Sequence, residues 1–151
     1  MLGSVGALVY KNQGPDTAPA SSSIPETNAA SSGKHVCPKG PEAASDEQIN
    51  SWIRQTLTVM KQNEIPGSFD GIKRNLIRES GCKVRAINLT DINAKNGVPS
   101  KGLLQVIPPT FEANHVPGTS KDIYDPVANL AAACNYAAHR YGSIDNVNGA
   151  Y

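Results

Sequence analysis

The sequence predicts an all-α domain, and three observations lead to that fold class. Aromatic residues make up only 5% of the chain while alanine is common, which favours closely packed helices over a β-sandwich. Apolar residues recur at the helical period in several stretches. The same stretches begin and end at residues that typically cap helices. Together these signals favour helices joined by long polar loops.

Residues 1–44 are expected to form a tail ahead of this domain. Residues 1–10 (MLGSVGALVY) are mildly apolar and short, so we interpret them as the remnant of a signal or anchor segment. The residues that follow are rich in Ser, Ala, Pro, Thr and Gly, and they cannot bury enough apolar surface to offset their ordering entropy. We therefore expect a flexible linker, or a disordered terminus without a role, and then a domain over residues 45–151.

The first helix is expected over Asp46–Gln62. Ser45 and Gln48 stand three residues apart, as in a capping box, in which each side chain binds a backbone N–H that the helix leaves without a partner. An apolar stripe at helical spacing follows, made up of Ile49, Trp52, Ile53, Leu57 and Met60. The pair Pro66–Gly67 then breaks the chain.

The second helix, expected at about 68–80, carries a carboxylate on its apolar face. With about 100° of rotation per residue, Glu79 falls inside the stripe formed by Ile72 and Leu76. Burial disfavours the ionised form of a carboxyl group, so such a group keeps its proton nearer neutral pH and can donate it. The sequence leaves an alternative open, in which Glu79 frays outward in the last turn and is solvated. Gly81 suits a left-handed C-cap.

A long irregular segment and two short helices are expected next. Residues 83–100 contain Asn, Asp and Gly at a density that indicates turns, and loops of this length are often functional. The stretch 102–107 (GLLQVI) is expected to be a short apolar helix, whose one polar member, Gln105, needs a hydrogen-bond partner if it is buried. The stretch 108–111 (PPTF) begins another short helix.

The last helix is expected to start at Asp125–Pro126 and to end before Gly142. Small residues occupy two of its faces, so it is expected to be central and packed on both sides. Asn129 and Tyr136 lie two turns apart on one side. Both could face a cleft, or each could merely bind nearby backbone. No further element is expected from residue 143 onward.

The three cysteines allow one disulfide. Cys134 lies on a stripe of small residues, which favours a buried structural thiol. Cys37–Cys82 is the pairing we favour, and it would indicate an oxidising, extracytoplasmic compartment. No C-x-x-C pair occurs and the histidines are scattered, so no metal site is expected.

Composition excludes several classes of partner. Fourteen Lys and Arg against thirteen Asp and Glu give a net charge of +1. This charge is too small to indicate binding to nucleic acid or to an anionic membrane. No apolar run approaches the roughly 20 residues of a membrane span. No G-x-G-x-x-G or Walker sequence is present, so no nucleotide cofactor is expected. We expect a monomer that needs no cofactor.

Four motifs, in order, carry a family likeness. They are E-S-G at 79–81 followed by AIN, S-K-G-L-L-Q at 100–105 followed by P-x-T-F, D-P-x-x-N at 125–129, and a Tyr seven residues after that Asn. Over about residues 68–142 this pattern resembles the soluble lytic transglycosylase (SLT) domain, which shares the lysozyme-like fold with goose-type lysozyme. The actinobacterial secreted or phage-associated variety is the most similar. The sequence departs from the family at Leu104, where Met is usual, and at Cys82.

The resemblance implies cleavage of the β-1,4 bond between N-acetylmuramic acid and N-acetylglucosamine in peptidoglycan. Glu79 would protonate the glycosidic oxygen and then act as base on the 6-hydroxyl of the same muramic sugar, which closes a 1,6-anhydro ring. No second carboxylate is then needed, whereas ordinary glycosidases use two. Asp91 is the best candidate for a second carboxylate, because its loop could fold over the cleft.

The resemblance also implies roles for neighbouring residues. Gln105 and Tyr136 would contact the sugar or orient Glu79. Ser100 and Gly102 are lesser candidates at the substrate, Gly102 through close backbone approach. Ser80 and Asn129 are expected to be structural, as a backbone cap and a brace.

The sequence leaves three functions open. The first is a lytic transglycosylase acting on glycan strands, and the second is a hydrolytic muramidase on the same fold, with Asp91 as its second carboxylate. The third is a non-catalytic peptidoglycan-binding or structural module. Anhydro ends separate the first from the second, and the effect of Glu79→Gln separates both from the third. In each case we expect an extracytoplasmic protein, either secreted, bound to the wall or membrane, or carried in a phage virion.

Overall fold

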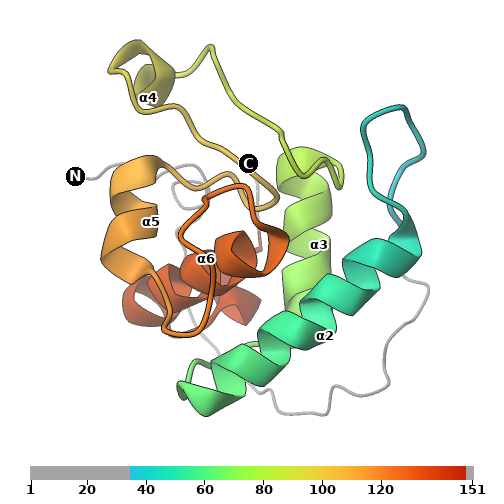
Figure 1. Ribbon diagram of the computed structural model, residues 1–151, viewed down its shortest axis with the longest axis vertical. Helices are drawn as coiled ribbons and strands as arrows, with labels where there is room; N and C mark the ends of the chain where they lie inside the picture. The colour runs from blue at the N-terminus through green and yellow to red at the C-terminus, as the bar shows by residue number, and fades with distance from the viewer. Residues whose placement is uncertain (1–34, 149–151) are drawn as a thin grey trace.

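The computed structural model describes residues 35–148 and confirms the prediction of an all-α fold. Its elements are α2 (Asp46–Gln62), α3 (Phe69–Ser80), α4 (Ile92–Lys95), α5 (Pro108–Asn114), α6 (Pro126–Tyr141) and the 3-10 helix η1 (Ile144–Asn146) (Figure 1). Within residues 35–148, extended segments pair only at isolated bridges and build no strand. The predicted anchor remnant at 1–10 and the linker up to residue 34 lie outside the described residues.

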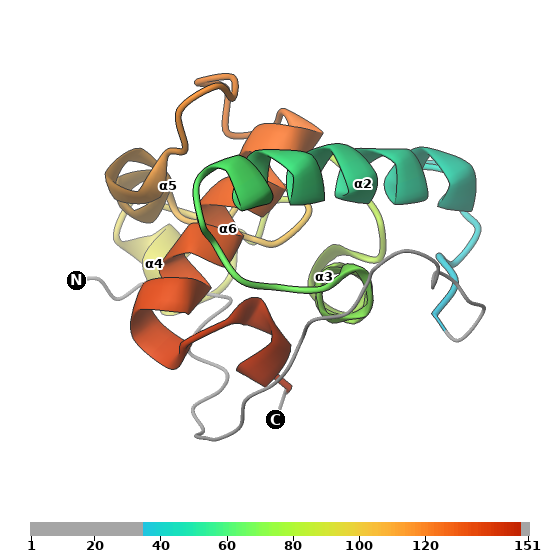
Figure 2. The same ribbon diagram turned by 90° about the horizontal axis from the view of Figure 1, so that it is seen from below.

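Helix α6 is the centre of the fold, as its small residues predicted. Figures 1 and 2 show it between α2 on one side and α5 on the other. Its alanines let both neighbours approach closely, and η1 packs against its far end. The largest fully buried side chains around it are Ile49, Ile53, Met60, Ile72, Leu76, Leu103, Leu104, Leu130 and Ile144. Burial of each such side chain stabilises the fold by about 1.5–3 kcal/mol.

Helix α2 has the predicted bounds and the predicted capping box between Ser45 and Gln48. The chain contacts the domain ahead of the predicted boundary at residue 45. Cys37 forms a disulfide with Cys82, the pairing that the sequence favoured. The Ala44 N–H donates to the Cys82 carbonyl over 2.9 Å. The segment before α2 is therefore fastened to the end of α3.

The stretch 102–107 is a tight turn, and the prediction of a helix there was wrong. Lys101 and Val106 exchange two backbone hydrogen bonds of 2.9 and 3.0 Å across this turn. Gly102 (φ +83°) and Gln105 (φ +53°) both adopt left-handed backbone conformations, which a right-handed helix excludes. A short apolar run without a helical period is compatible with a buried turn as well as with a helix.

Two short elements were not predicted. In the polar stretch 83–100, α4 forms a single helical turn whose N-terminus is capped by the Asp91 side chain. After residue 143, η1 is capped by the Ser143 side chain and buries Ile144 against the core. Both elements depend on local capping by a side chain rather than on apolar periodicity.

Among residues 35–148, no helix is both long enough and apolar enough to cross a bilayer.

Candidate active site

Glu79 lies in the last turn of α3, a helix that is capped at both ends. The Ser68 side chain accepts from the Gly71 N–H at the N-terminus, and Gly81 ends the helix with a left-handed conformation (φ +62°). Ile72 and Leu76 of the same stripe are fully buried. Only 6% of the Glu79 side chain is exposed, so the helix presents the carboxylate to the interior and not to bulk water.

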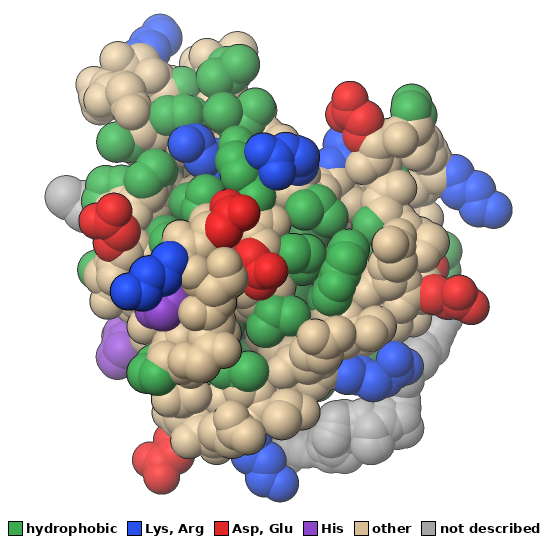
Figure 3. Space-filling view, viewed as in Figure 1, with side chains coloured by type: hydrophobic (Ala, Val, Ile, Leu, Met, Phe, Trp, Pro, Cys, Tyr) green, Lys and Arg blue, Asp and Glu red, His purple; other side chains and the backbone are tan. Residues whose placement is uncertain are grey.

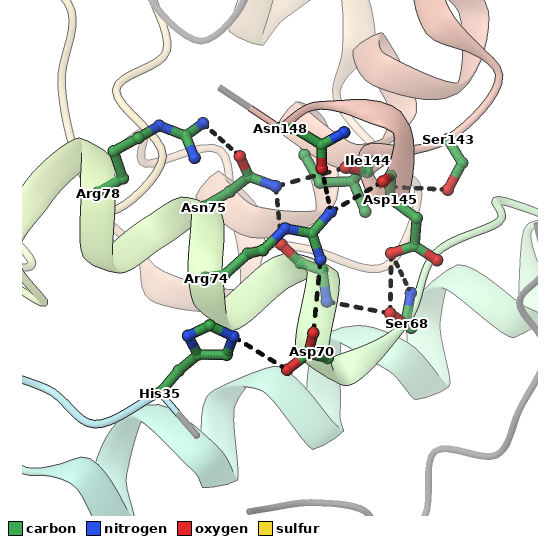
Figure 4. A network of polar contacts seen from close by, with 11 residues as sticks. His35, Ser68, Asp70, Arg74, Asn75, Arg78, Ser143, Ile144, Asp145 and Asn148 are labelled. Atoms are coloured by element: carbon green, nitrogen blue, oxygen red, sulfur yellow. Dashed lines mark hydrogen bonds and ion pairs between the residues drawn. The ribbon is translucent and has the colours of Figure 1, made fainter. Parts of the chain in front are cut away.

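Arg78 brings a positive charge to this carboxylate. Its Nη2 lies 3.7 Å from Glu79 Oε2 and also donates to Asn75 Oδ1. The Asn75 amide nitrogen donates in turn to the carbonyls of Gly71, at 2.8 Å, and Ile144, at 3.4 Å (Figure 4). These contacts were not predicted from the sequence. Their signal was spacing, because Asn75 stands three residues before Arg78 and four before Glu79 on one helix.

The other end of α3 is held by a carboxylate from the C-terminal part of the domain. Asp145 Oδ1 accepts from the Ser68 N–H at 3.1 Å and from its hydroxyl at 2.8 Å (Figure 4). Arg74 Nη2 donates to the Asp145 carbonyl at 2.8 Å and to Asn148 Oδ1 at 2.9 Å. These contacts fix the position of α3 relative to η1.

Gln105 stands in the turn that follows the long loop, and only 6% of the residue is exposed. Its side-chain nitrogen donates both hydrogens to backbone, to the Ala86 carbonyl at 3.1 Å and to the Gly102 carbonyl at 3.0 Å. An amide nitrogen has two hydrogens, so only the amide oxygen of Gln105 could accept from a sugar.

Asn129 fastens this turn to α6. Its Oδ1 accepts from the Leu104 N–H at 2.8 Å, and its Nδ2 donates to the carbonyls of Lys101 and Ile123 at 3.0 and 2.8 Å. The residue is fully buried, so it faces the turn and not a cleft. Asn129 therefore braces the turn against α6.

Tyr136, on the same helix, is half-buried. Burial raises the pKa of its hydroxyl and the nearby Tyr141 adds to the rise, while Arg140 opposes it. The hydroxyl therefore stays protonated at neutral pH and is available as a hydrogen-bond donor.

Two of the remaining predicted residues, Ser80 and Asp91, are held by local contacts. The Ser80 hydroxyl donates to the Leu76 carbonyl at 3.0 Å, as a backbone cap does. Ser100 is fully buried, and its hydroxyl has no hydrogen-bond partner among the described residues, so it does not reach a surface where a sugar could bind. Asp91 Oδ1 accepts from the Ala94 N–H at 3.0 Å. The helix that Asp91 caps, α4, lies at the tip of its loop, away from α3 in both views (Figures 1 and 2).

One face of the molecule combines acidic, basic and hydrophobic side chains. Figure 3 shows acidic side chains among hydrophobic ones near the centre of this face, with Lys and Arg side chains directly above them. Within residues 35–148, no group of three or more His, Cys, Asp or Glu side chains is arranged to hold a metal ion.

The Cys37–Cys82 disulfide directly follows the E-S-G sequence. Cys82 has a left-handed backbone (φ +68°), as does Gly81 before it, so the chain turns sharply away from α3 at this point. The disulfide holds that reversal in place one residue after the helix cap.

Comparison with known proteins finds a matching family and a similar protein. The family described as "Transglycosylase SLT domain" matches residues 72–151. The "Uncharacterized protein YqbO" of Bacillus subtilis (strain 168) is 55% identical over 102 residues, which are 67% of this chain and 6% of that protein. The chain thus spans a small part of this relative's length. No solved structure matches the chain.

Proposed function

Because the chain belongs to the transglycosylase SLT domain family, with its all-α lysozyme-like fold, we propose that it is a peptidoglycan lytic transglycosylase. Its substrate is the β-1,4 bond between N-acetylmuramic acid and N-acetylglucosamine. The observation that carries the proposal is a single carboxylate, Glu79, whose side chain is 6% exposed on the apolar face of α3.

Glu79 performs both proton transfers in this mechanism. The carboxylic acid gives its proton to the glycosidic oxygen as the bond from that oxygen to C1 of the muramic sugar breaks. The 6-hydroxyl oxygen of the same sugar then bonds to C1 and closes the 1,6-anhydro ring. Its proton passes to the Glu79 carboxylate, which restores the acid. No water molecule is consumed, and the atoms balance with one catalytic residue.

Burial and a nearby cation act in opposite directions on the protonation of Glu79. Burial disfavours the charged carboxylate, whereas the Arg78 guanidinium 3.7 Å away favours it. The bond from Arg78 to Asn75 holds the guanidinium to one side of the acid. This balance suits a group that must be an acid in the first step and a base in the second.

The position of Asp91 supports transglycosylation over hydrolysis. Hydrolysing glycosidases place two carboxyl groups about 5–9.5 Å apart across the bond. Asp91, the predicted second carboxylate, caps α4 at the tip of the loop and is bound to the Ala94 N–H there. Asp91 is therefore held at the tip of the loop and not beside Glu79.

Tyr136 and the Gln105 amide oxygen complete the proposed site. The protonated Tyr136 hydroxyl is available to orient Glu79 or the sugar. We expect Tyr136→Phe to keep the fold and lower kcat, because the ring is retained and only the donor is lost. The Cys37–Cys82 disulfide supports our proposal that the protein works outside the cytoplasm, where such bonds persist.

The test is digestion of purified peptidoglycan with the wild type and Glu79→Gln side by side. Glutamine has the shape of the acid but no acidic proton to transfer, so activity should fall by about 100-fold or more. Glu112→Gln on the exposed surface of α5 is the matched control and should keep full activity. Mass spectrometry should find anhydro ends, which lack one water relative to hydrolysed ends.

Other outcomes would point to the competing functions. Hydrolysed ends would identify a muramidase. Binding without cleavage, equal in the wild type and Glu79→Gln, would identify a wall-binding module.

A further inference from the structure

Two basic side chains share one aromatic ring beside the candidate site. The Arg85 guanidinium carbon lies 4.3 Å from the centre of the Tyr124 ring, and Lys101 Nζ lies 5.9 Å from the same point. Arg85 follows α3, Lys101 precedes the Gln105 turn, and Tyr124 precedes α6. Three segments that are distant in sequence thus converge, and we call these three residues the basic cluster.

Within residues 35–148, no acidic side chain pairs with the basic cluster. Neither Arg85 nor Lys101 makes an ion pair with any residue of the described part of the chain. The acidic residues next to Tyr124 in the sequence accept hydrogen bonds from the backbone: Asp122 from the Tyr124 N–H and Asp125 from the Ala128 N–H, each at 2.9 Å. Two like charges repel one another, and contact with the ring offsets this only in part. A bound carboxylate would neutralise both.

The position of the basic cluster relates it to the proposed active site. The Ala86 carbonyl, next to Arg85, accepts from the Gly102 N–H at 2.8 Å and from the Gln105 side chain at 3.1 Å. Gly102 itself follows Lys101. The two cations therefore flank the contact that holds Gln105, and Arg85 stands six residues after Glu79.

We propose that Arg85, Lys101 and Tyr124 form a subsite for the carboxylates of the stem peptides that peptidoglycan carries on its muramic sugars. This inference rests on the proposed function and adds a specificity to it. A glycan strand bound at Glu79 projects its peptides away from the sugar backbone, where their carboxylates can meet the two cations. The protein would then distinguish strands that carry peptides from strands that have been stripped of them.

The experiment compares two soluble substrates, peptide-bearing glycan strands and strands stripped by an amidase. The variant Arg85→Gln/Lys101→Gln should lose about 10-fold in kcat/KM on peptide-bearing strands and change less than about two-fold on stripped strands. The reason is that the peptide carboxylates leave with the peptide, whereas the lactyl carboxylate that the amidase exposes lies close to the sugar ring. The loss should shrink as salt is added. Lys83→Gln/Lys95→Gln removes the same charge from exposed positions of the same loop and should leave both values unchanged.

A second pair of variants tests the ring. Tyr124→Leu should lower kcat/KM on peptide-bearing strands, while Tyr124→Phe, which keeps the aromatic face, should retain it. Equal losses on both substrates, or an equal loss in the lysine control, would overturn the subsite. If the wild type cleaved neither substrate, the proposed function would fail. The subsite would then be judged by binding of the same variants to the two kinds of strand, and equal binding would overturn it.

Discussion

Gly102 and Asn129 approach so closely that the glycine has no room for a side chain. A Cβ atom on Gly102 would lie 2.8 Å from Asn129 Cγ, and the Asn129 amide cannot retreat because three hydrogen bonds hold it. The backbone at Gly102 is also left-handed, with φ +83°. The turn that carries Gln105 therefore requires glycine at position 102, where it meets a residue 27 positions away.

Gly102→Ala should destabilise the fold by about 2–4 kcal/mol, the combined effect of backbone strain and overpacking. Urea unfolding measures this loss. Gly118→Ala is the control, because Gly118 has a similar φ of +93° and open space around it. Gly118→Ala should lower the free energy of unfolding only through backbone strain, by about 1 kcal/mol. Equal losses in the two variants would show that contact with Asn129 contributes nothing.

Loss of the disulfide should destabilise the domain strongly. Cys37 and Cys82 are 45 residues apart, and a cross-link of that span stabilises by about 4 kcal/mol in the chain-entropy description. Cys37→Ser/Cys82→Ser should therefore lower the urea midpoint and reduce activity, since the bond fixes the chain directly after α3. A reductant should lower the midpoint of the wild type and leave that of the double variant unchanged. A reductant effect on the double variant would contradict this assignment.

The pair between Asp46 and Lys73 should make stability fall at acid pH. Burial alone would raise the pKa of Asp46, but the Lys73 ammonium, 2.8 Å away, and the Cys37 N–H together lower it below its usual value of 3.8. A carboxyl group with a lower pKa in the folded chain stabilises the fold above the pKa of the unfolded chain. That stability is lost as pH falls through 3.8 and below.

Asp46→Asn tests this pair. At pH 7 it should lower the free energy of unfolding by about 1–2 kcal/mol, because Lys73 is buried and would lose its partner while the carboxylate is partly exposed. Between pH 5 and pH 2 its stability should change less than that of the wild type, and the two curves should converge. Asp70→Asn removes an exposed carboxylate from α3, the helix of Lys73, and should lower the free energy of unfolding by less at pH 7. Parallel curves for Asp46→Asn and the wild type would refute the linkage.

Cys134 should be unreactive in the folded protein. Burial raises the pKa of this thiol above its usual range and Asp145 adds to the rise, so almost no thiolate forms near neutral pH. The side chain is fully buried in α6. We expect no alkylation by iodoacetamide at pH 8 in the native state and rapid alkylation in denaturant with the disulfide intact. Rapid native labelling, measured by mass spectrometry, would contradict the buried position.

Local signals in the sequence predicted much of this domain. The capping box at Ser45 fixed the start of α2, and Asp125–Pro126 fixed the start of α6. The stripe of Ile72 and Leu76 predicted the buried position of Glu79. Each signal lies within a few residues of the feature that it predicts. Tertiary packing does not override such local contacts in this domain.

The features that were not predicted from the sequence depend on contacts between distant segments. Gln105 adopts a left-handed backbone that nothing in its own sequence demands, because its side chain binds the Ala86 carbonyl 19 residues away. Lys73 lies off the apolar stripe and is nevertheless buried, because α2 supplies Asp46 as its partner. The basic cluster likewise joins three segments, and no one of them identifies it alone.

Helix α3 is fastened at its start by Asp145, along its side by Asp46, and just past its end by Cys82. A proton donor mounted on such a helix cannot travel toward its target. If Glu79 is the acid that we propose, the sugar has to be brought to it, because the helix that carries this side chain is held in place.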